Sequence, residues 1–323
     1  MSDVVIGVDG GNTKTDVVAA TLDGEPLAYV RGPGSNSHGI GADGCVEVIA
    51  ALVERAGLET PAHHGAFFLC GADVADDIEE LTEALNRKAW VRHAIVDNDT
   101  FALLHAGTDA PDAVAVVCGA GINCVGRAAN GRTARYPSLG WETGDWGGGE
   151  QLGREAFFHA ARAEDGRGEP TSLVELVRGY FGLPTVVAAG EAIHYGRIPR
   201  HRVGELAPRV VAAAAAGDAV AQRLVEGVAE EIVLMAVRAL RDLALTEADV
   251  VLGGGMLQEP FLADAVITKL HERVAGARPI VVTEPPVLGA ALAALDAAHA
   301  PAAARERLRE ELPAFAPEDV RGR

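Results

Sequence analysis

The sequence predicts an α/β protein built from two structurally related lobes. Its 323 residues are too many for one ordinary hydrophobic core and suit two lobes of roughly 100–200 residues each. The chain begins with apolar strands joined by a glycine turn and a hairpin, and this pattern recurs from residue 112. Strands and helices alternate after the first meander, which is typical of a mixed sheet covered by helices. The relation between the lobes is one of pattern rather than of residue identity.

The first half of the sequence opens with a three-stranded meander. An apolar run enters the turn Gly10-Gly11-Asn12, and Asp23-Gly24 is a hairpin signal between the next two strands. Asp43 is expected to cap the first helix and Gly57 to end it. Strands are predicted at 3–9, 14–22, 26–31, 65–70 and 91–97, and helices at 44–56, 76–88 and from Asn98 to about 106.

The second half repeats the meander and then becomes largely helical. Gly119-Ala120-Gly121 and Asn130-Gly131 supply its two turns. One long helix has apolar residues at i, i+4 spacing from Val220 to Ile232. Strands are predicted at 112–118, 122–127, 132–136, 249–252 and 279–283, and helices at 149–163, 171–181, 201–216, 218–243, 260–274 and 287–298, with a charged surface helix within 302–323.

Composition and charge exclude several classes of protein. Hydrophobic residues make up 49% and charged residues 23% of the chain, which is typical of a globular protein. The net charge of -18 comes without a Lys/Arg cluster, so we expect no nucleic-acid partner. The first residues lack a signal-peptide pattern and no run of about 18 apolar residues is present, so we expect a cytoplasmic protein without a membrane span. Cys45, Cys70, Cys118 and Cys124 lack metal-site spacing and are expected to be reduced, buried thiols.

Three glycine-rich turns follow apolar strands, at 9–14, 119–123 and 253–256. Glycine lets the backbone adopt positive φ and approach a ligand closely, and successive N–H groups in such turns form a cradle for an anion. None of the three matches the P-loop pattern or a GxGxxG turn that opens a helix. The repeated strand-and-turn pattern therefore predicts nucleotide binding of another type, with the candidate residues Gly10, Gly11, Asn12, Thr13, Lys14, Gly119, Gly121, Asn123, Gly253, Gly254 and Gly255.

Two aspartates stand at predicted strand ends. Asp9 directly precedes the first glycine turn, so it would serve as a Mg²⁺ ligand if a nucleotide bound there; it would otherwise stabilise the turn. Asp99 follows the strand at 91–97, and it is either a helix N-cap or the general base that accepts a hydroxyl proton during phosphoryl transfer.

The segment 141–149, WETGDWGGG, combines two of the three tryptophans with two carboxylates and four glycines. An aromatic ring covers the C–H face of a sugar, while carboxylates accept hydrogen bonds from its hydroxyl groups. A purely structural turn does not need this mixture. The segment therefore predicts a sugar site that uses Glu142, Asp145 and Trp146.

These motifs together resemble those of the actin/Hsp70/hexokinase superfamily of sugar kinases. DGGNTKT at 9–15 and GAGIN at 119–123 are similar to its two phosphate loops, and GGGML at 253–257 is similar to its adenosine loop. The resemblance is strongest to the N-acetylglucosamine kinase and BadF/BadG/BcrA/BcrD-type ATPase family, and it covers about residues 3–298. It implies two actin-like lobes, each a five-stranded mixed sheet with helices, at 1–112 with about 288–323 and at 113–287. ATP and Mg²⁺ would bind between the lobes.

The resemblance also implies roles for individual residues. Asn36, in the GPGSN loop, matches a residue that contacts the sugar. Asp99 matches the catalytic aspartate, and Asp145 matches an aspartate that binds sugar hydroxyls. Homodimers are frequent in this family, so we expect one here.

One departure from the family pattern bears on the substrate. This chain has GDWGG where N-acetylglucosamine kinases commonly have GDEGS, so Trp146 replaces an acid and Glu142 lies just upstream. The segment is similar to that of actinobacterial glucosamine kinases. Glu142 and Asp145 would attract the protonated amine of glucosamine, and Trp146 would crowd an acetyl group. These features predict phosphorylation of the 6-hydroxyl of glucosamine, with N-acetylglucosamine as the alternative acceptor.

Two other functions within the superfamily remain open. Some relatives are ATPases that activate 2-hydroxyacyl-CoA dehydratases and carry an iron–sulfur cluster on cysteines, but no cysteine pair here has cluster-like spacing. A sugar-sensing regulator would usually add a basic helix-turn-helix, and no such segment is evident. We therefore expect a small-molecule sugar as the partner of this protein.

Overall fold

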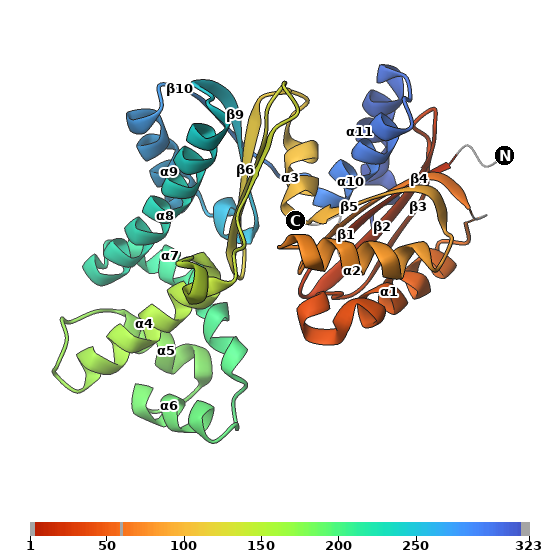
Figure 1. Ribbon diagram of the computed structural model, residues 1–323. Helices are drawn as coiled ribbons and strands as arrows, with labels where there is room; N and C mark the ends of the chain where they lie inside the picture. The colour runs from red at the N-terminus through yellow and green to blue at the C-terminus, as the bar shows by residue number, and fades with distance from the viewer. Residues whose placement is uncertain (1–3, 59–60, 318–323) are drawn as a thin grey trace. The chain divides into compact units, whose positions relative to one another are not determined.

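The computed structural model describes residues 4–58 and 61–317, and these form two compact units. Unit 1 contains the described residues up to Asp109 and from Glu284 onward, and unit 2 runs from Ala110 to Thr283. The boundaries lie three or four residues from the predicted ones. Each unit has its own sheet and its own core (Figure 1).

Unit 1 contains a five-stranded mixed sheet in the order β3-β2-β1-β4-β5. The first three strands form an antiparallel meander, and β4 and β5 run parallel to β1. This arrangement places the ends of β1, β4 and β5 at the same edge of the sheet. The strands are β1 (Val4–Gly10), β2 (Lys14–Thr21), β3 (Pro26–Pro33), β4 (Ala62–Leu69) and β5 (Val91–Asn98).

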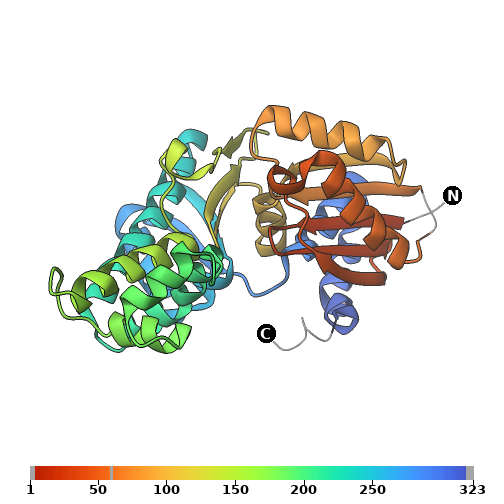
Figure 2. The same ribbon diagram turned by 90° about the horizontal axis from the view of Figure 1, so that it is seen from below.

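Helices cover both faces of this sheet. On one face, two helices pack against each other and against the apolar side chains of the strands; these are α1 (Ser37–Arg55) and α2 (Ala75–Asn86). On the other face the chain returns from unit 2, and α10 contacts β1, β2 and β4 (Figure 2). The helices of that second face are α3 (Thr100–Gly107), α10 (Pro286–Ala297) and α11 (Ala302–Phe315).

Unit 2 repeats the topology with the sheet order β10-β9-β6-β7-β8. Strands β6, β7 and β8 form an antiparallel meander, and β9 and β10 continue parallel to β6. The predicted duplication and the two five-stranded mixed sheets are therefore confirmed. The strands are β6 (Ala113–Cys118), β7 (Ile122–Arg127), β8 (Thr133–Arg135), β9 (Glu247–Gly253) and β10 (Gly276–Val281).

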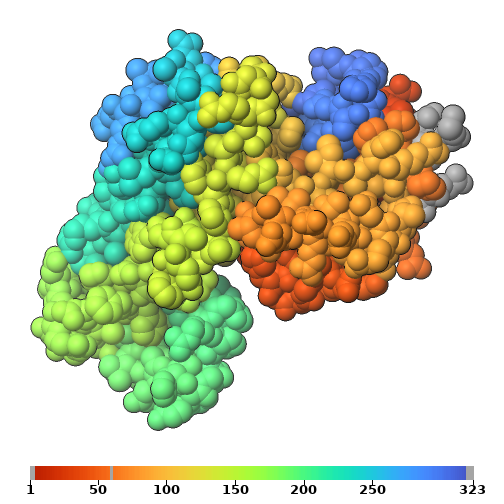
Figure 3. Space-filling view, viewed as in Figure 1, coloured from red at the N-terminus to blue at the C-terminus, as the bar shows by residue number. Residues whose placement is uncertain are grey.

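The remaining helices of unit 2 pack against its sheet and against one another in one hydrophobic core. Helix α8 packs on β6, β7 and β8 and is flanked by α7 and α9. Helices α4, α5 and α6 contact one another, and α4 also packs against α7 and α8; they form the green surface in the lower part of Figure 3. The helices are α4 (Gly148–Glu164), α5 (Leu173–Phe181), α6 (Val186–His194), α7 (Ala207–Ala215), α8 (Ala219–Leu243) and α9 (Pro260–Arg273), with 3₁₀ turns at Gly140–Thr143, Arg200–Leu206 and Gly255–Gln258.

The structure corrects three helix predictions. Helix α1 begins at Ser37 rather than near 44, and its cap is Asn36, whose side chain accepts a hydrogen bond from the His38 N–H. Gly41, with φ of 74°, interrupts the helix after its first turn, and Asp43 pairs with Arg87 instead of capping. Helix α6 was not predicted. The predicted helix at 201–216 divides into a 3₁₀ turn and α7.

No single helix of the described chain is long and apolar enough to cross a membrane, although the bent pair α5–α6 passes the same test by length and composition.

Gly254 offers a test of the close backbone contact between the third glycine turn and Cys118 in β6. Its φ of 95° and ψ of 157° lie in a region that is essentially restricted to glycine, and a Cβ atom there would lie 2.4 Å from the carbonyl oxygen of Cys118. We expect Gly254→Ala to lower the free energy of unfolding by about 2–3 kcal/mol in urea titrations. Gly255→Ala is the matched control, because a Cβ atom at Gly255 meets no described atom within 4 Å. Equal stability of the two variants would contradict a structural need for glycine at position 254.

Candidate active site

Two of the predicted site carboxylates lie at the same edge of the sheet in unit 1. Asp9 is the penultimate residue of β1, and Asp99 directly follows β5. Asp9 is only 8% exposed. Removal from water raises the pKa of Asp9 to about 8 and that of Asp99 to about 7, and the negative charge of Asp99 contributes to the rise at Asp9. A raised pKa favours the protonated form of a carboxyl group. A cation bound nearby would favour the ionised form of these two aspartates instead.

The side chain of Asp99 does not cap the helix that it precedes. Asp99 has helical φ and ψ and makes no side-chain cap hydrogen bond. The cap is supplied by Asn98 instead, whose Oδ1 accepts a hydrogen bond from the Thr100 N–H at 2.9 Å. The helix-cap alternative for Asp99 therefore lacks the hydrogen bond that defines it, although the nearby Thr100 N–H and hydroxyl lower the pKa of the Asp99 carboxyl against the larger effect of burial.

Asp9 has the character of a ligand for a hard cation. No hydrogen bond to its carboxylate is present among residues 4–58 and 61–317, whereas the neighbouring buried Asp16 is paired with Arg31 and Lys14 at 2.7 and 3.1 Å. Within the same described ranges, no three His, Cys, Asp or Glu side chains converge on one point. Mg²⁺ does not require such a cage, because it keeps several waters and binds one or two carboxylates together with substrate phosphates. Asp9 therefore fits the expected ion.

The first glycine turn is held by the loop that carries Asn36. The Gly11 N–H donates to the Lys14 carbonyl at 2.9 Å, and the Ser35 N–H donates to the Gly11 carbonyl at 3.0 Å. The Asn36 amide donates to Oδ1 of Asn12. A predicted nucleotide residue and a predicted sugar residue thus meet directly.

Two other predicted residues of this turn have different surroundings. Thr13 is exposed, whereas Lys14 already pairs with Asp16. Lys14 would therefore have to leave Asp16 to reach a phosphate.

The second glycine turn in unit 2 is fixed by the start of α4. The Gly149 N–H donates to the Gly119 carbonyl at 2.8 Å, and the Glu150 N–H donates to the Ala120 carbonyl at 2.9 Å. Gly148, with φ of 73°, allows this contact, because a Cβ atom there would lie 2.5 Å from the Ala120 oxygen. Part of the glycine content of 141–149 therefore has a structural role.

Several predicted phosphate-loop glycines are not required by the fold itself. A Cβ atom at Gly119, Gly121 or Gly255 would meet no described atom within 4 Å, and none of the three has positive φ. The positive φ expected for these turns is found only at Gly254. Space beside an ordinary backbone is what a closely approaching ligand requires.

The remaining predicted residue of this loop, Asn123, is engaged by its own strand. Its Oδ1 accepts hydrogen bonds from the Ser138 hydroxyl and from the Cys124 N–H, each at 2.6 Å. Gly253 ends β9 beside Val117 of β6. Both residues therefore support the turns from within the sheet.

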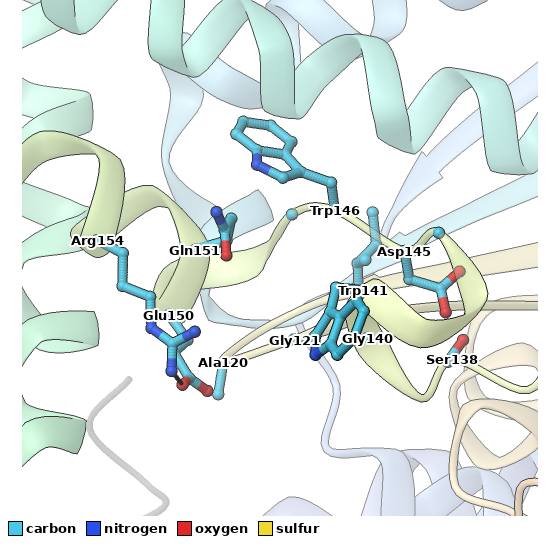
Figure 4. A pocket seen from close by; sticks show the side chains of 13 residues that line it. Ala120, Gly121, Ser138, Gly140, Trp141, Asp145, Trp146, Glu150, Gln151 and Arg154 are labelled. Atoms are coloured by element: carbon cyan, nitrogen blue, oxygen red, sulfur yellow. Dashed lines mark hydrogen bonds and ion pairs between the residues drawn. The ribbon is translucent and has the colours of Figure 1, made fainter. Parts of the chain in front are cut away.

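A cavity of about 510 Å³ lies beside the second glycine turn (Figure 4). Trp141, which is 85% exposed, and Asp145 line it together with Ala120 and Gly121. Asp145 accepts a hydrogen bond from the Thr143 hydroxyl. An aromatic face beside a carboxylate and backbone amides is a suitable lining for a sugar.

The structure separates Glu142 and Trp146 from the roles predicted for them. Glu142 is exposed and does not line the cavity. The Trp146 indole borders the cavity but points away from Asp145 (Figure 4) and lies 3.4 Å from the position of a Cβ atom at Gly227 in α8. The direction of side chains in this loop depends on packing against α8, which spacing along the sequence does not reveal.

The sequence analysis did not identify Asp73, which lies near Asp99, or its contact with Asn98. Asp73 lies between β4 and α2, and its Oδ1 accepts a hydrogen bond from the Asn98 amide at 2.7 Å. Burial raises the pKa of Asp73 to about 6, although the nearby His38 lowers it. A polar Asn98 next to the strand-end Asp99 was a local signal, but nothing in the sequence connected it with Asp73.

The cysteines do not form an obvious reactive site. Cys45, Cys118 and Cys124 are buried, and Cys70 is partly exposed. Burial raises the pKa of Cys45 to about 11 and that of Cys118 to about 12. Iron–sulfur ligation uses thiolates, so these surroundings do not favour the alternative function of an iron–sulfur ATPase.

Comparisons with known proteins agree with this arrangement. The chain is 26% identical over 318 residues to the N-acetyl-D-glucosamine kinase of Dictyostelium discoideum, covering 91% of this chain and 98% of that protein. It is 28% identical over 261 residues to the N-acetylmuramic acid/N-acetylglucosamine kinase of Clostridium acetobutylicum, covering 78% and 85%.

A solved structure also shares the fold. The crystal structure of a proposed N-acetylglucosamine kinase from Chromobacterium violaceum matches with a TM-score of 0.71 at 23% identity, covering 91% of this chain and 99% of that one. This match confirms the predicted actin-like fold. A model of the BadF/BadG/BcrA/BcrD ATPase family matches residues 6–294, which is most of the chain, and the protein therefore belongs to that family.

Proposed function

We propose that this protein is a sugar kinase that transfers the γ-phosphoryl group of ATP to the 6-hydroxyl of a neutral 2-acetamido sugar. The observation that carries this proposal is Asp99, a strand-end carboxylate that is free of capping and has a pKa of about 7. A general base works best when its pKa lies near the operating pH. The relatives from Dictyostelium and Clostridium are both named as kinases of N-acetylglucosamine, a neutral 2-acetamido sugar, and the Clostridium protein is also named for the acidic sugar N-acetylmuramic acid.

Asp99 would accept the proton of the sugar hydroxyl while its oxygen forms a bond to the γ-phosphorus. The bond between that phosphorus and the bridging oxygen breaks, and ADP leaves with the electron pair. Asp9 would hold Mg²⁺, which neutralises charge on the phosphate oxygens when bound. Unit 1 supplies Asn36 beside the first glycine turn. Unit 2 supplies the turns at 119–121 and 253–255, whose N–H groups would stabilise phosphate charge.

The acetamido sugar is favoured over glucosamine for two structural reasons. Glu142, on which the attraction for a cationic amine depended, is exposed outside the cavity. The Trp146 ring packs toward α8, so it does not crowd an acetyl group as the sequence had suggested. Trp141 offers an aromatic face on which an acetyl methyl group would pack.

The role of Asp99 can be tested by Asp99→Asn. This variant should keep the fold and bind the sugar, but lower kcat by about 10²–10⁴, because the amide cannot accept the hydroxyl proton. Asp76→Asn, which alters an exposed carboxylate of the same unit, is the control and should remain close to wild type. Turnover by Asp99→Asn at the wild-type rate would remove the base from the mechanism.

The same base defines the pH dependence of the wild-type enzyme. Asp99 accepts a proton only when ionised, and its raised pKa leaves it protonated below about pH 7. The value of kcat/KM should therefore rise by about tenfold per pH unit up to that pH and then level off.

The second glycine turn can be tested by Gly119→Val. A branched side chain should fill the space beside the backbone and weaken ATP binding by roughly tenfold or more, equivalent to about 1.4 kcal/mol. Gly179→Val in α5 is the matched control, since a Cβ atom there also meets no described atom within 4 Å. Calorimetry that finds the two variants equal in ATP affinity would place this turn outside the nucleotide site.

The acceptor can be identified from kcat/KM for N-acetylglucosamine, glucosamine and glucose. We expect N-acetylglucosamine to be the best substrate. Glu142→Gln should change the ratio of glucosamine to glucose by less than about twofold, because a solvated carboxylate contributes little to binding. A preference for glucosamine that falls about tenfold in Glu142→Gln would instead restore the assignment made from the sequence.

A further inference from the structure

Asp73 is linked to the proposed base, Asp99, by a hydrogen bond to the preceding residue, Asn98. Asp73 follows the turn after β4, and its side chain is 12% exposed. Its Oδ1 accepts a hydrogen bond from Nδ2 of Asn98 at 2.7 Å. Asn98 is itself 4% exposed and immediately precedes Asp99. A charged acceptor facing a nearly buried amide makes a stronger contact than a neutral one.

This contact determines which way the Asn98 carboxamide faces. An ionised carboxylate only accepts hydrogen bonds and a backbone N–H only donates one. The NH₂ group of Asn98 must therefore face Asp73, and its oxygen must face Thr100, where the N–H lies 2.9 Å away. The Thr100 N–H donates to Asn98, and the Asp99 side chain makes no cap hydrogen bond.

Asp73 is in turn held by groups from two other segments. The Asp77 carboxylate accepts hydrogen bonds from the N–H groups of Asp73 and Val74 at 3.3 and 3.2 Å. The His38 ring lies between the two aspartates, with Nδ1 3.9 Å from Asp73 and Nε2 3.4 Å from Asp77. His38 also donates its backbone N–H to Asn36. The start of α1, the start of α2 and the end of β5 are thus linked.

We propose that Asp73 is a positioning residue of the phosphoryl transfer, which orients Asn98 and thereby keeps the Asp99 carboxylate available to the sugar hydroxyl. The inference rests on the proposed kinase function and adds a residue that does not touch the substrate. The charge of Asp73 also contributes, after burial, to the raised pKa of Asp99, so its removal has an electrostatic consequence that a purely structural contact lacks.

The first experiment compares Asp73→Asn with Asp76→Asn. Both remove one negative charge from the same short segment, but Asp76 is exposed and does not contact Asn98. An asparagine at 73 still accepts a hydrogen bond but also competes as a donor for the Asn98 oxygen. We expect kcat to fall about tenfold with the sugar KM within about threefold, consistent with weakening one hydrogen bond to a charged group.

The pH profile separates positioning from simple loss of stability. Without the neighbouring negative charge, the pKa of Asp99 falls, so the acidic limb of kcat/KM should move to lower pH in Asp73→Asn and stay in place in Asp76→Asn. An unmoved limb together with a wild-type kcat in Asp73→Asn would overturn the proposal and leave the kinase function intact.

A swapped pair tests the hydrogen bond directly. Asn98→Asp places two carboxylates against each other and should lower kcat/KM at least a hundredfold, since like charges in a partly buried site repel. Asp73→Asn combined with Asn98→Asp restores one donor and one acceptor, with a carboxylate oxygen still facing the Thr100 N–H. The double variant should recover at least tenfold relative to Asn98→Asp. A double variant no better than that single variant would overturn the proposal.

A measurement that does not need catalysis keeps this test independent of the proposed function. Hydrogen exchange of the Thr100 amide should be faster in Asp73→Asn than in wild type and Asp76→Asn, because its cap is loosened. If wild type phosphorylates no sugar, the kinase proposal fails and takes the catalytic part of this inference with it. Faster exchange would then support only the orientation of Asn98 by Asp73, and unchanged exchange would refute that orientation whether or not a sugar is phosphorylated.

Discussion

The organisation of unit 1 depends on the cost of keeping carboxylates away from water. Asp9, Asp16 and Asp99 lie in or directly after strands of its sheet, and their surroundings differ. Asp16 is buried and paired with Arg31 and Lys14, so its charge is neutralised within the sheet. Asp9 and Asp99 receive no comparable cation, and their pKa values rise as a result. Carboxylates that no cationic side chain neutralises are suited to bind a metal ion or to accept a proton from a substrate.

The parallel strands explain why these two groups lie near each other. Because β4 pairs with both β1 and β5 in parallel, the chain delivers the ends of all three strands to one edge of the sheet. The loops that follow then carry Asn12, Asp73 and Asp99 respectively. Residues that are far apart in sequence are brought to one edge through strand direction alone, and this is the usual location of ligand sites in open α/β sheets.

Much of the fold was predictable because its signals are local. The two meanders are marked by apolar runs and by glycine or Asn-Gly turns, and their strands were placed within a few residues. The start of α1 was missed because Asp43 looked like a better cap than Asn36, and the break at Gly41 hid the first turn. The strand ends are marked by local signals, so the positions of Asp9 and Asp99 at one edge of the sheet were predictable. Side-chain direction depends on distant packing, so the orientations of Glu142 and Trp146 and the contact of Asp73 with Asn98 were not predictable.

The glycines around the second turn divide into two groups with different consequences for how the protein tolerates variation. Gly148 and Gly254 allow backbone segments to touch, so any side chain there disturbs folding. Gly119, Gly121 and Gly255 face open space, so the folded chain has no need of them. A library selected for cellular abundance would therefore lose variants at the first group and retain them at the second. The same library selected for growth on the substrate would lose both, and the difference between the two selections would map the surface that the ligand covers.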